Sequence, residues 1–148
     1  MTTAQIAGST VRTAPADSGL SIRRLNVMRF GYAFMGVGLA IVKWPLLLDL
    51  GSHPVMDGVV TSILTAMSLL VFLGLRYPVK LLPILLFEVI WKLIWMAAVA
   101  VPYLASGTAN AGIDSVLFSC SFIIVVIAVI PWGYAWKQYA KAAGDPWR

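Results

Sequence analysis

Residues 81–104 read LLPILLFEVIWKLIWMAAVAVPYL, an apolar run interrupted by a single acid and a single base. As an α-helix rising 1.5 Å per residue, such a run is roughly 36 Å long, enough to cross a hydrocarbon core about 30 Å thick. Three more apolar runs cover about residues 26–48, 58–75 and 115–134. An α-helix satisfies all its own backbone polar groups in lipid, so the sequence predicts an all-α integral membrane four-helix bundle.

The composition supports this fold class and excludes several functions. Of the 148 residues, 60% are hydrophobic and 11% are charged, whereas about 25% are charged in a soluble domain. Little chain remains for a separate catalytic domain, so any chemistry would have to take place in the bundle or its short loops. With one cysteine and one histidine, the chain has too few ligands for an iron–sulfur cluster, a bis-histidine haem or a His-rich zinc site. We predict no metal.

The charged residues outside the apolar runs predict the orientation. Residues 1–20 are predicted to be a disordered tail, and residues 137–148 a short polar tail. The connections near residues 49–57 and 105–114 contain acids and no Lys or Arg. The bases flank the other ends of the spans: Arg12, Arg23, Arg24, Arg29, Arg76, Lys80, Lys137, Lys141 and Arg148. Because Lys and Arg favour the cytoplasmic side, both termini are predicted to be cytoplasmic, in a bacterial inner membrane. The spread of these bases argues against nucleic acid as a partner.

Glu88 and Lys92 lie inside the third span, four residues apart, which places them on one helix face. Charge inside a bilayer is costly unless it is paired or hydrated, so the pair is expected to face the bundle interior. A structural interpretation is a self-neutralising pair that fixes the rotation of the helix. A functional interpretation is a site for a proton, an ion or a lipid head group.

Lys43, near the end of the first span, is a third candidate. Its ammonium would snorkel to the outer interface near Asp49, or it would turn inward and share Glu88 with Lys92. The second arrangement would leave a net positive site, suited to an anionic ligand or a polarised carbonyl.

Aromatic residues follow the pair at helical spacing. Phe87, Trp91 and Trp95 recur every four residues and form one stripe of the third helix. Such a stripe is usually packing, but next to an acid–base pair it also predicts a wall for a flat apolar ligand such as a quinone or lipid.

Small residues and prolines mark where helices should approach closely or break. Gly36 and Ala40 form a small-xxx-small pattern that favours close helix packing. Pro45 and Pro131 should each disturb the backbone near a helix end, because proline has no N–H to donate.

Arg29-Phe30-Gly31, followed by Phe34, Gly38 and Lys43, resembles the opening helix of the DoxX-like superfamily of small four-helix bacterial membrane proteins. The run RYPVKLLPILLFEVIWKLIW at residues 76–95 is similar to a group of uncharacterised bacterial membrane proteins. The DoxX resemblance implies a subunit of a quinone-linked or thiol-related redox system, with Arg29, Gly31, Gly38 and Lys43 as family-pattern positions.

Together these features predict a non-catalytic inner-membrane protein with an intramembrane pocket at Glu88, Lys92 and Lys43. Its ligand would be lipid-like or quinone-like, or a membrane partner would cover the site. A quinone is the only cofactor that the sequence suggests. A small proton-coupled transporter or channel using Glu88 is an alternative, and a DoxX-like redox subunit is another. The partners expected are membrane lipid, another membrane protein or a second copy of the chain.

Overall fold

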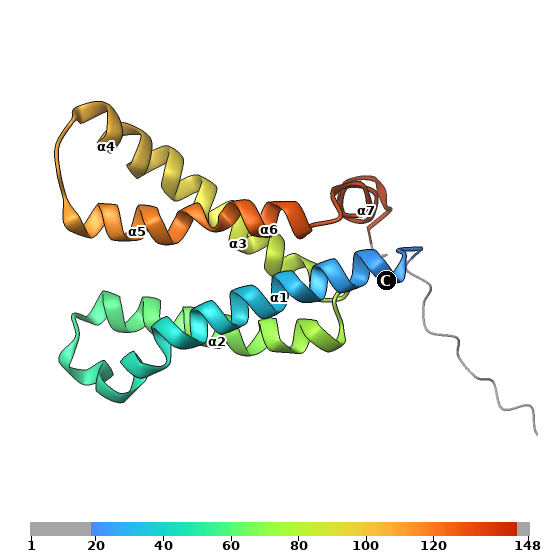
Figure 1. The fold of residues 1–148 in the computed structure, drawn as a ribbon, viewed down its shortest axis with the longest axis horizontal. Helices are drawn as coiled ribbons and strands as arrows, with labels where there is room; N and C mark the ends of the chain where they lie inside the picture. The colour runs from blue at the N-terminus through green and yellow to red at the C-terminus, as the bar shows by residue number, and fades with distance from the viewer. Residues whose placement is uncertain (1–18, 145–148) are drawn as a thin grey trace, which may run out of the picture.

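The computed structural model describes residues 19–144, which are helical apart from short turns and contain no strand. Four helices there are long and apolar enough to cross a membrane (Figure 1). They comprise residues Ile22–Lys43, Val55–Arg76, Leu82–Ser106 and Ala111–Val129. The predicted all-α class with four spans is therefore confirmed, while residues 1–18 of the predicted N-terminal tail lie outside the described residues.

The first span, α1 (Ile22–Lys43), begins earlier and ends earlier than predicted. Ser21 caps its start, with the Ser21 Oγ accepting a hydrogen bond from the Arg24 backbone N–H at 3.3 Å. The helix ends just before Pro45, which opens the 3₁₀ segment η1 (Pro45–Ser52). The prediction extended the span to residue 48 because the apolar composition continues past this proline, whereas the α-helical backbone does not.

The second span, α2 (Val55–Arg76), is a single unbroken helix. The third span is α3 (Leu82–Trp95), a π-helical turn η2 (Met96–Ala100) and α4 (Val101–Ser106). The backbone N–H of Val101 donates to Met96, five residues back. This wide turn immediately precedes Pro102, whose ring would clash with a carbonyl in a regular helix.

The fourth span consists of α5 (Ala111–Ser121) and α6 (Ile123–Val129), with a break at Phe122. Ser119 and Ser121 donate their hydroxyls to carbonyls of the preceding turn, a pattern that bends helices. The span ends before Pro131, not at residue 134 as predicted. After Pro131 the chain forms α7 (Trp132–Trp136) and η3 (Lys137–Lys141), so the predicted C-terminal tail is helical as far as Lys141.

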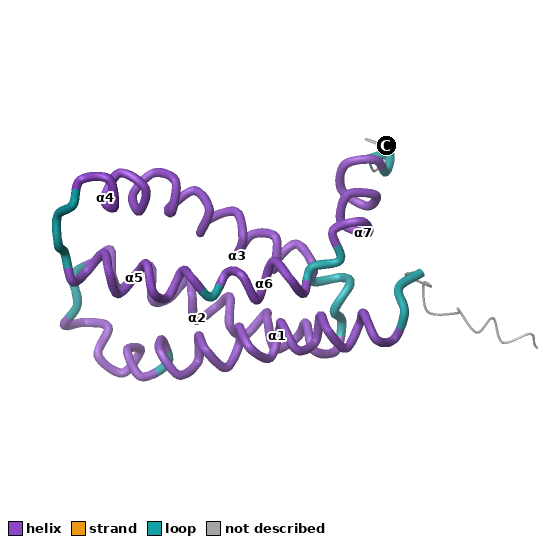
Figure 2. Tube along the Cα trace, turned by 45° about the horizontal axis from the view of Figure 1, so that its top comes forward, coloured by secondary structure: helices purple, strands orange, loops and turns teal. Residues whose placement is uncertain are grey.

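The four spans form two helical hairpins, α1–α2 and α3–α6. Both described chain ends lie at one end of the bundle, which we call the terminal end; the opposite end, with residues 44–54 and 107–110, is the loop end (Figures 1 and 2). Helix α6 packs against α1 and α3, whereas α5 packs against η2. The hairpins therefore meet toward the terminal end and lie apart at the loop end (Figure 1).

Close backbone approach holds the core at the terminal end. Tyr32 is fully buried, and its hydroxyl donates to the Pro78 carbonyl at 2.8 Å in the turn between α2 and α3. A Cβ on Gly74 would lie 2.5 Å from the Tyr32 ring, and one on Gly31 would overlap the Val129 side chain. Glycine at these two positions therefore lets α1 contact α2 and α6.

Two arginines of α1 satisfy carbonyls at the ends of other spans. The Arg29 Nε donates to the Leu75 carbonyl of α2 at 3.1 Å, and an Arg24 Nη donates to the Ile130 carbonyl after α6 at 2.6 Å. The last carbonyls of a helix have no partner within the helix, and cations also interact favourably with that end. These side chains therefore connect α1 to α2 within its own hairpin and to the end of α6 in the other hairpin.

Candidate functional site

Glu88, Trp91 and Lys92 form a closed polar network on one face of α3. The Lys92 Nζ lies 2.8 Å from the Glu88 Oε1, and the Trp91 Nε1 donates to the Glu88 Oε2 at 2.7 Å. The ammonium also lies 5.6 Å from the centroid of the Trp91 ring, within range of a cation–π contact. Glu88 is 2% exposed and Lys92 9%. The ion pair between Glu88 and Lys92 and its burial confirm that the two charges share an inward face.

The network lies near the middle of the spans. Lys92 is ten residues after Leu82 and fourteen before Ser106, or roughly 15 and 21 Å from the two ends of the third span. Ser121 is ten residues after Ala111 and eight before Val129 in the fourth span. The ion pair and the break in the fourth span therefore lie at similar depths in the bundle.

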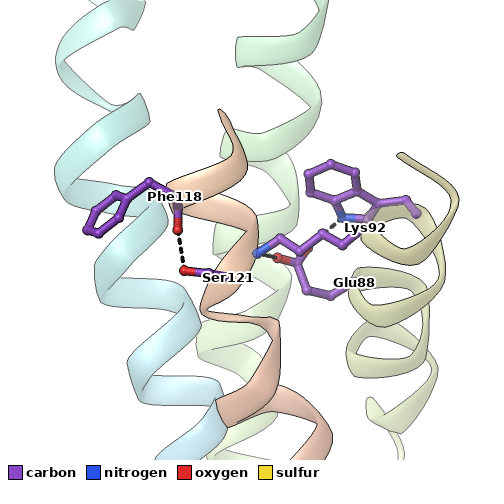
Figure 3. A network of polar contacts seen from close by, with 5 residues as sticks. Glu88, Lys92, Phe118 and Ser121 are labelled. Atoms are coloured by element: carbon purple, nitrogen blue, oxygen red, sulfur yellow. Dashed lines mark hydrogen bonds and ion pairs between the residues drawn. The ribbon is translucent and has the colours of Figure 1, made fainter. Parts of the chain in front are cut away.

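The side chain of Lys92 extends from α3 toward the break between α5 and α6 (Figure 3). At that break the Ser121 hydroxyl donates to the Phe118 carbonyl at 2.6 Å. The neighbouring Cys120 is 1% exposed. In the sequence, Cys120 between Ser119 and Ser121 indicates buried packing, and spacing alone does not predict that this part of the fourth span faces Lys92.

The chemistry that the network offers is that of a hydrogen-bond donor. Both oxygens of the Glu88 carboxylate already accept a hydrogen bond or ion pair. An ammonium has three N–H donors, and among the described residues Glu88 is the acceptor for Lys92. The Lys92 side chain is 11% exposed, so it can also donate to a carbonyl or anionic oxygen. Within residues 19–144 no three His, Cys, Asp or Glu side chains are grouped so as to hold a metal ion.

The structure does not bring Lys43 to this network. Lys43 is the last residue of α1, is partly buried, and forms no ion pair with any residue between 19 and 144. Its charge lies in the last turn of a helix, where it complements the helix dipole. The predicted sharing of Glu88 between Lys43 and Lys92 is therefore not observed.

The aromatic stripe is divided between different surroundings. Phe87 is 52% exposed on the surface of α3, while Trp91 and Trp95 are partly buried. Of the three, Trp91 contacts the pair, and it does so through its indole N–H and its ring face. Phe87 consequently belongs to the outer surface of the bundle and not to a wall around the pair.

The remaining family-pattern positions are Arg29, Gly31 and Gly38, and none of them contacts the Glu88–Lys92 pair through a hydrogen bond or ion pair. Arg29 donates to the Leu75 carbonyl and to the Asn26 Oδ1, and Gly31 packs on Val129. A Cβ on Gly38 would meet no atom within 4 Å. The two glycines that share one pattern in the sequence therefore differ in their packing.

Comparisons with protein-family models, with curated proteins and with solved structures give no match to this chain. The resemblance of the first span to the DoxX-like superfamily therefore stays a prediction. The site has to be interpreted from its own geometry.

Proposed function

We propose that this chain is a non-catalytic bacterial inner-membrane protein that binds a lipid-like or quinone-like molecule at the Lys92 ammonium. The observation that carries the proposal is the arrangement of this ammonium in mid-span. Glu88 and Trp91 fix its position from one side, and its side chain extends toward the break in the fourth span. A buried cation held in this way is a ready donor to a ligand oxygen.

The surroundings of Lys92 define the ligand class. Glu88 neutralises Lys92, so the site can accept the oxygen of a neutral carbonyl without leaving a net charge in lipid. Apolar residues from both neighbouring spans, such as Val89, Ile123 and Val126, are buried in the same core. A ligand with one polar oxygen and an apolar body fits this combination.

Native mass spectrometry of the detergent-purified chain tests the proposal. We expect wild type to carry a bound small molecule, Lys92→Met to lose it, and Lys43→Met to retain it. Lys43→Met is a matched control because it removes one lysine charge from a span without touching the network. If Lys92→Met does not fold, the neutral double variant Glu88→Gln/Lys92→Met removes the donor without leaving an unpaired carboxylate.

An empty wild type, with variants that differ only in thermal stability, would show that the pair is purely architectural. Retention of the molecule by both Lys92 variants would place its binding elsewhere.

Proton-coupled transport through Glu88 stays a prediction, and proton flux in proteoliposomes with wild type and Glu88→Gln would test it. Copurification of a redox protein would instead support the DoxX-like subunit.

The proposed orientation has both termini in the cytoplasm. Among the described residues, the loop end carries Asp49, Asp57 and Asp114, with Lys43 as its base. The terminal end carries seven bases and no acid: Arg23, Arg24, Arg29, Arg76, Lys80, Lys137 and Lys141. The preference of Lys and Arg for the cytoplasmic side supports placing the terminal end there.

A further inference from the structure

The segment after Pro131 leaves the direction of the fourth span. In Figure 1 α7 is seen along its axis while the spans run across the view, and in Figure 2 it rises away from them. Residues 132–141 therefore lie across the terminal end of the bundle. A helix in this direction at the end of the spans would lie along the membrane surface.

An open apolar groove of about 420 Å³ lies along this segment, beside Leu86 of the third span. Its lining residues are Leu86, Trp132, Ala135, Trp136, Tyr139 and Ala140. The volume is within the range of roughly 300–1,000 Å³ that is typical of small-molecule sites. We call it the C-terminal groove. It is separate from the Glu88–Lys92 network, none of whose residues lines it.

The aromatic side chains of the groove are exposed. Trp132 is 47% exposed, Trp136 63% and Tyr139 50%. Tryptophan and tyrosine favour the level of the lipid head groups, where an apolar ring and a polar N–H or O–H are both accommodated. The groove therefore suits the boundary between acyl chains and head groups.

The charge around the groove has one sign. Lys137 and Lys141 belong to the same segment, and the seven bases at this end have no acid among the described residues to neutralise them. An anionic molecule is the complementary occupant.

We propose that the C-terminal groove binds an anionic phospholipid. One acyl chain lies in the groove against Leu86 and Trp136, and the phosphate pairs with Lys137 and Lys141. The lipid fills the space between the surface segment and the third span, and so holds the segment against the bundle.

The test is native mass spectrometry of the full chain purified with phosphatidylglycerol or phosphatidylcholine of identical acyl chains. Wild type should retain one phosphatidylglycerol in preference to phosphatidylcholine. Lys137→Gln/Lys141→Gln should weaken retention of phosphatidylglycerol by about thirty-fold, as expected for the loss of two lysines near an anionic lipid. Ala140→Phe, which fills the groove from an exposed position, should reduce retention of both lipids.

Two controls make the result specific. Arg76→Gln/Lys80→Gln removes two charges from the same end but not from the segment, and should keep most of the retained phosphatidylglycerol. The neutral double variant Glu88→Gln/Lys92→Met should keep it too, which separates this site from the one in mid-span. Equal losses in the two double variants would mean a diffuse attraction and overturn the site. Unchanged retention in Ala140→Phe would overturn the position of the acyl chain, and a lipid-free dimer would make a second copy the occupant.

Discussion

At the scale of single residues, the network on α3 is closed on itself. The Glu88 carboxylate accepts a hydrogen bond from Trp91, three residues later, and forms an ion pair with Lys92, four residues later. The polar groups of these three side chains are therefore paired within one helix, in an apolar core. The sequence predicts the Glu88–Lys92 pair because the spacing of four brings opposite charges together on any helix. The role of Trp91 was not predictable from spacing alone, since its indole N–H acts only in one rotamer.

Removing one charge should therefore harm the fold more than removing both. Breaking a buried pair leaves an uncompensated charge, so Glu88→Gln and Lys92→Met should each lower the free energy of unfolding by about 3–5 kcal/mol. The double variant Glu88→Gln/Lys92→Met should lose less than either single variant. Chemical unfolding in detergent micelles checks this, and a double variant as unstable as the sum of the singles would contradict it.

The two family-pattern glycines should respond oppositely to alanine. Gly31→Ala places a methyl group against the stiff Val129 side chain, and should destabilise the fold by about 1–3 kcal/mol. Gly38→Ala enters open space in mid-helix and should stabilise by up to about 1 kcal/mol. Melting temperatures of the two variants, measured in one detergent, distinguish them. Similar losses at both positions would mean that the backbone contact at Gly31 is not the cause.

At the scale of elements, the sequence predicts the four spans and misplaces their ends. The sequence stays hydrophobic beyond Pro45 and around Pro131, so a prediction from composition alone places the ends of the first and fourth spans later than the structure does. The two prolines indicate the true helix ends, because each lacks the N–H that would continue the helix. The π-helical turn lies next to Pro102 and the break at Phe122 follows Ser119 and Ser121, but these residues alone do not show whether a helix widens, breaks or continues.

Capping across spans gives a test with a matched pair of adjacent residues. Arg24→Gln removes the charged donor to the Ile130 carbonyl, and should cost about 1.5–3 kcal/mol, the range for a hydrogen bond to a charged group. Arg23→Gln changes the same charge at an exposed position and should cost less than about 0.5 kcal/mol. Thermal unfolding measured side by side decides this. Equal effects would point to net charge and not to the contact.

The turn at the loop end of the second hairpin is fixed by one phenol. The Tyr103 hydroxyl donates to the Asp114 Oδ1 at 2.8 Å and accepts from the Asn110 backbone N–H at 2.8 Å. Tyr103→Phe removes both contacts, and we expect faster hydrogen exchange at residues 107–112. Tyr77→Phe, at an exposed turn of the opposite end, should leave that exchange unchanged. Unaltered protection in Tyr103→Phe would show that Gly107, at a φ of 65°, sets the turn by itself.

At the scale of the whole molecule, the proposed orientation makes a labelling prediction. Because Cys120 is buried, the wild-type chain should give little background with a membrane-impermeant thiol reagent. In intact cells, Ser52→Cys and Thr108→Cys at the loop end should be labelled, while Gln138→Cys at the terminal end should be labelled only after lysis. Labelling of Gln138→Cys in intact cells would reverse the topology.

The reach of the two capping arginines also orders the assembly of the bundle during synthesis. The carbonyl that Arg29 caps lies 46 residues later in the chain, and the one that Arg24 caps lies 106 residues later. The first hairpin can therefore dock as soon as its second helix has left the ribosome. The hydrogen bond of Arg24 can form only after nearly the whole chain has been synthesised, so it is among the last contacts of the bundle to form. A nascent chain stalled before residue 130 should consequently remain open to chaperones and proteases that the finished protein excludes.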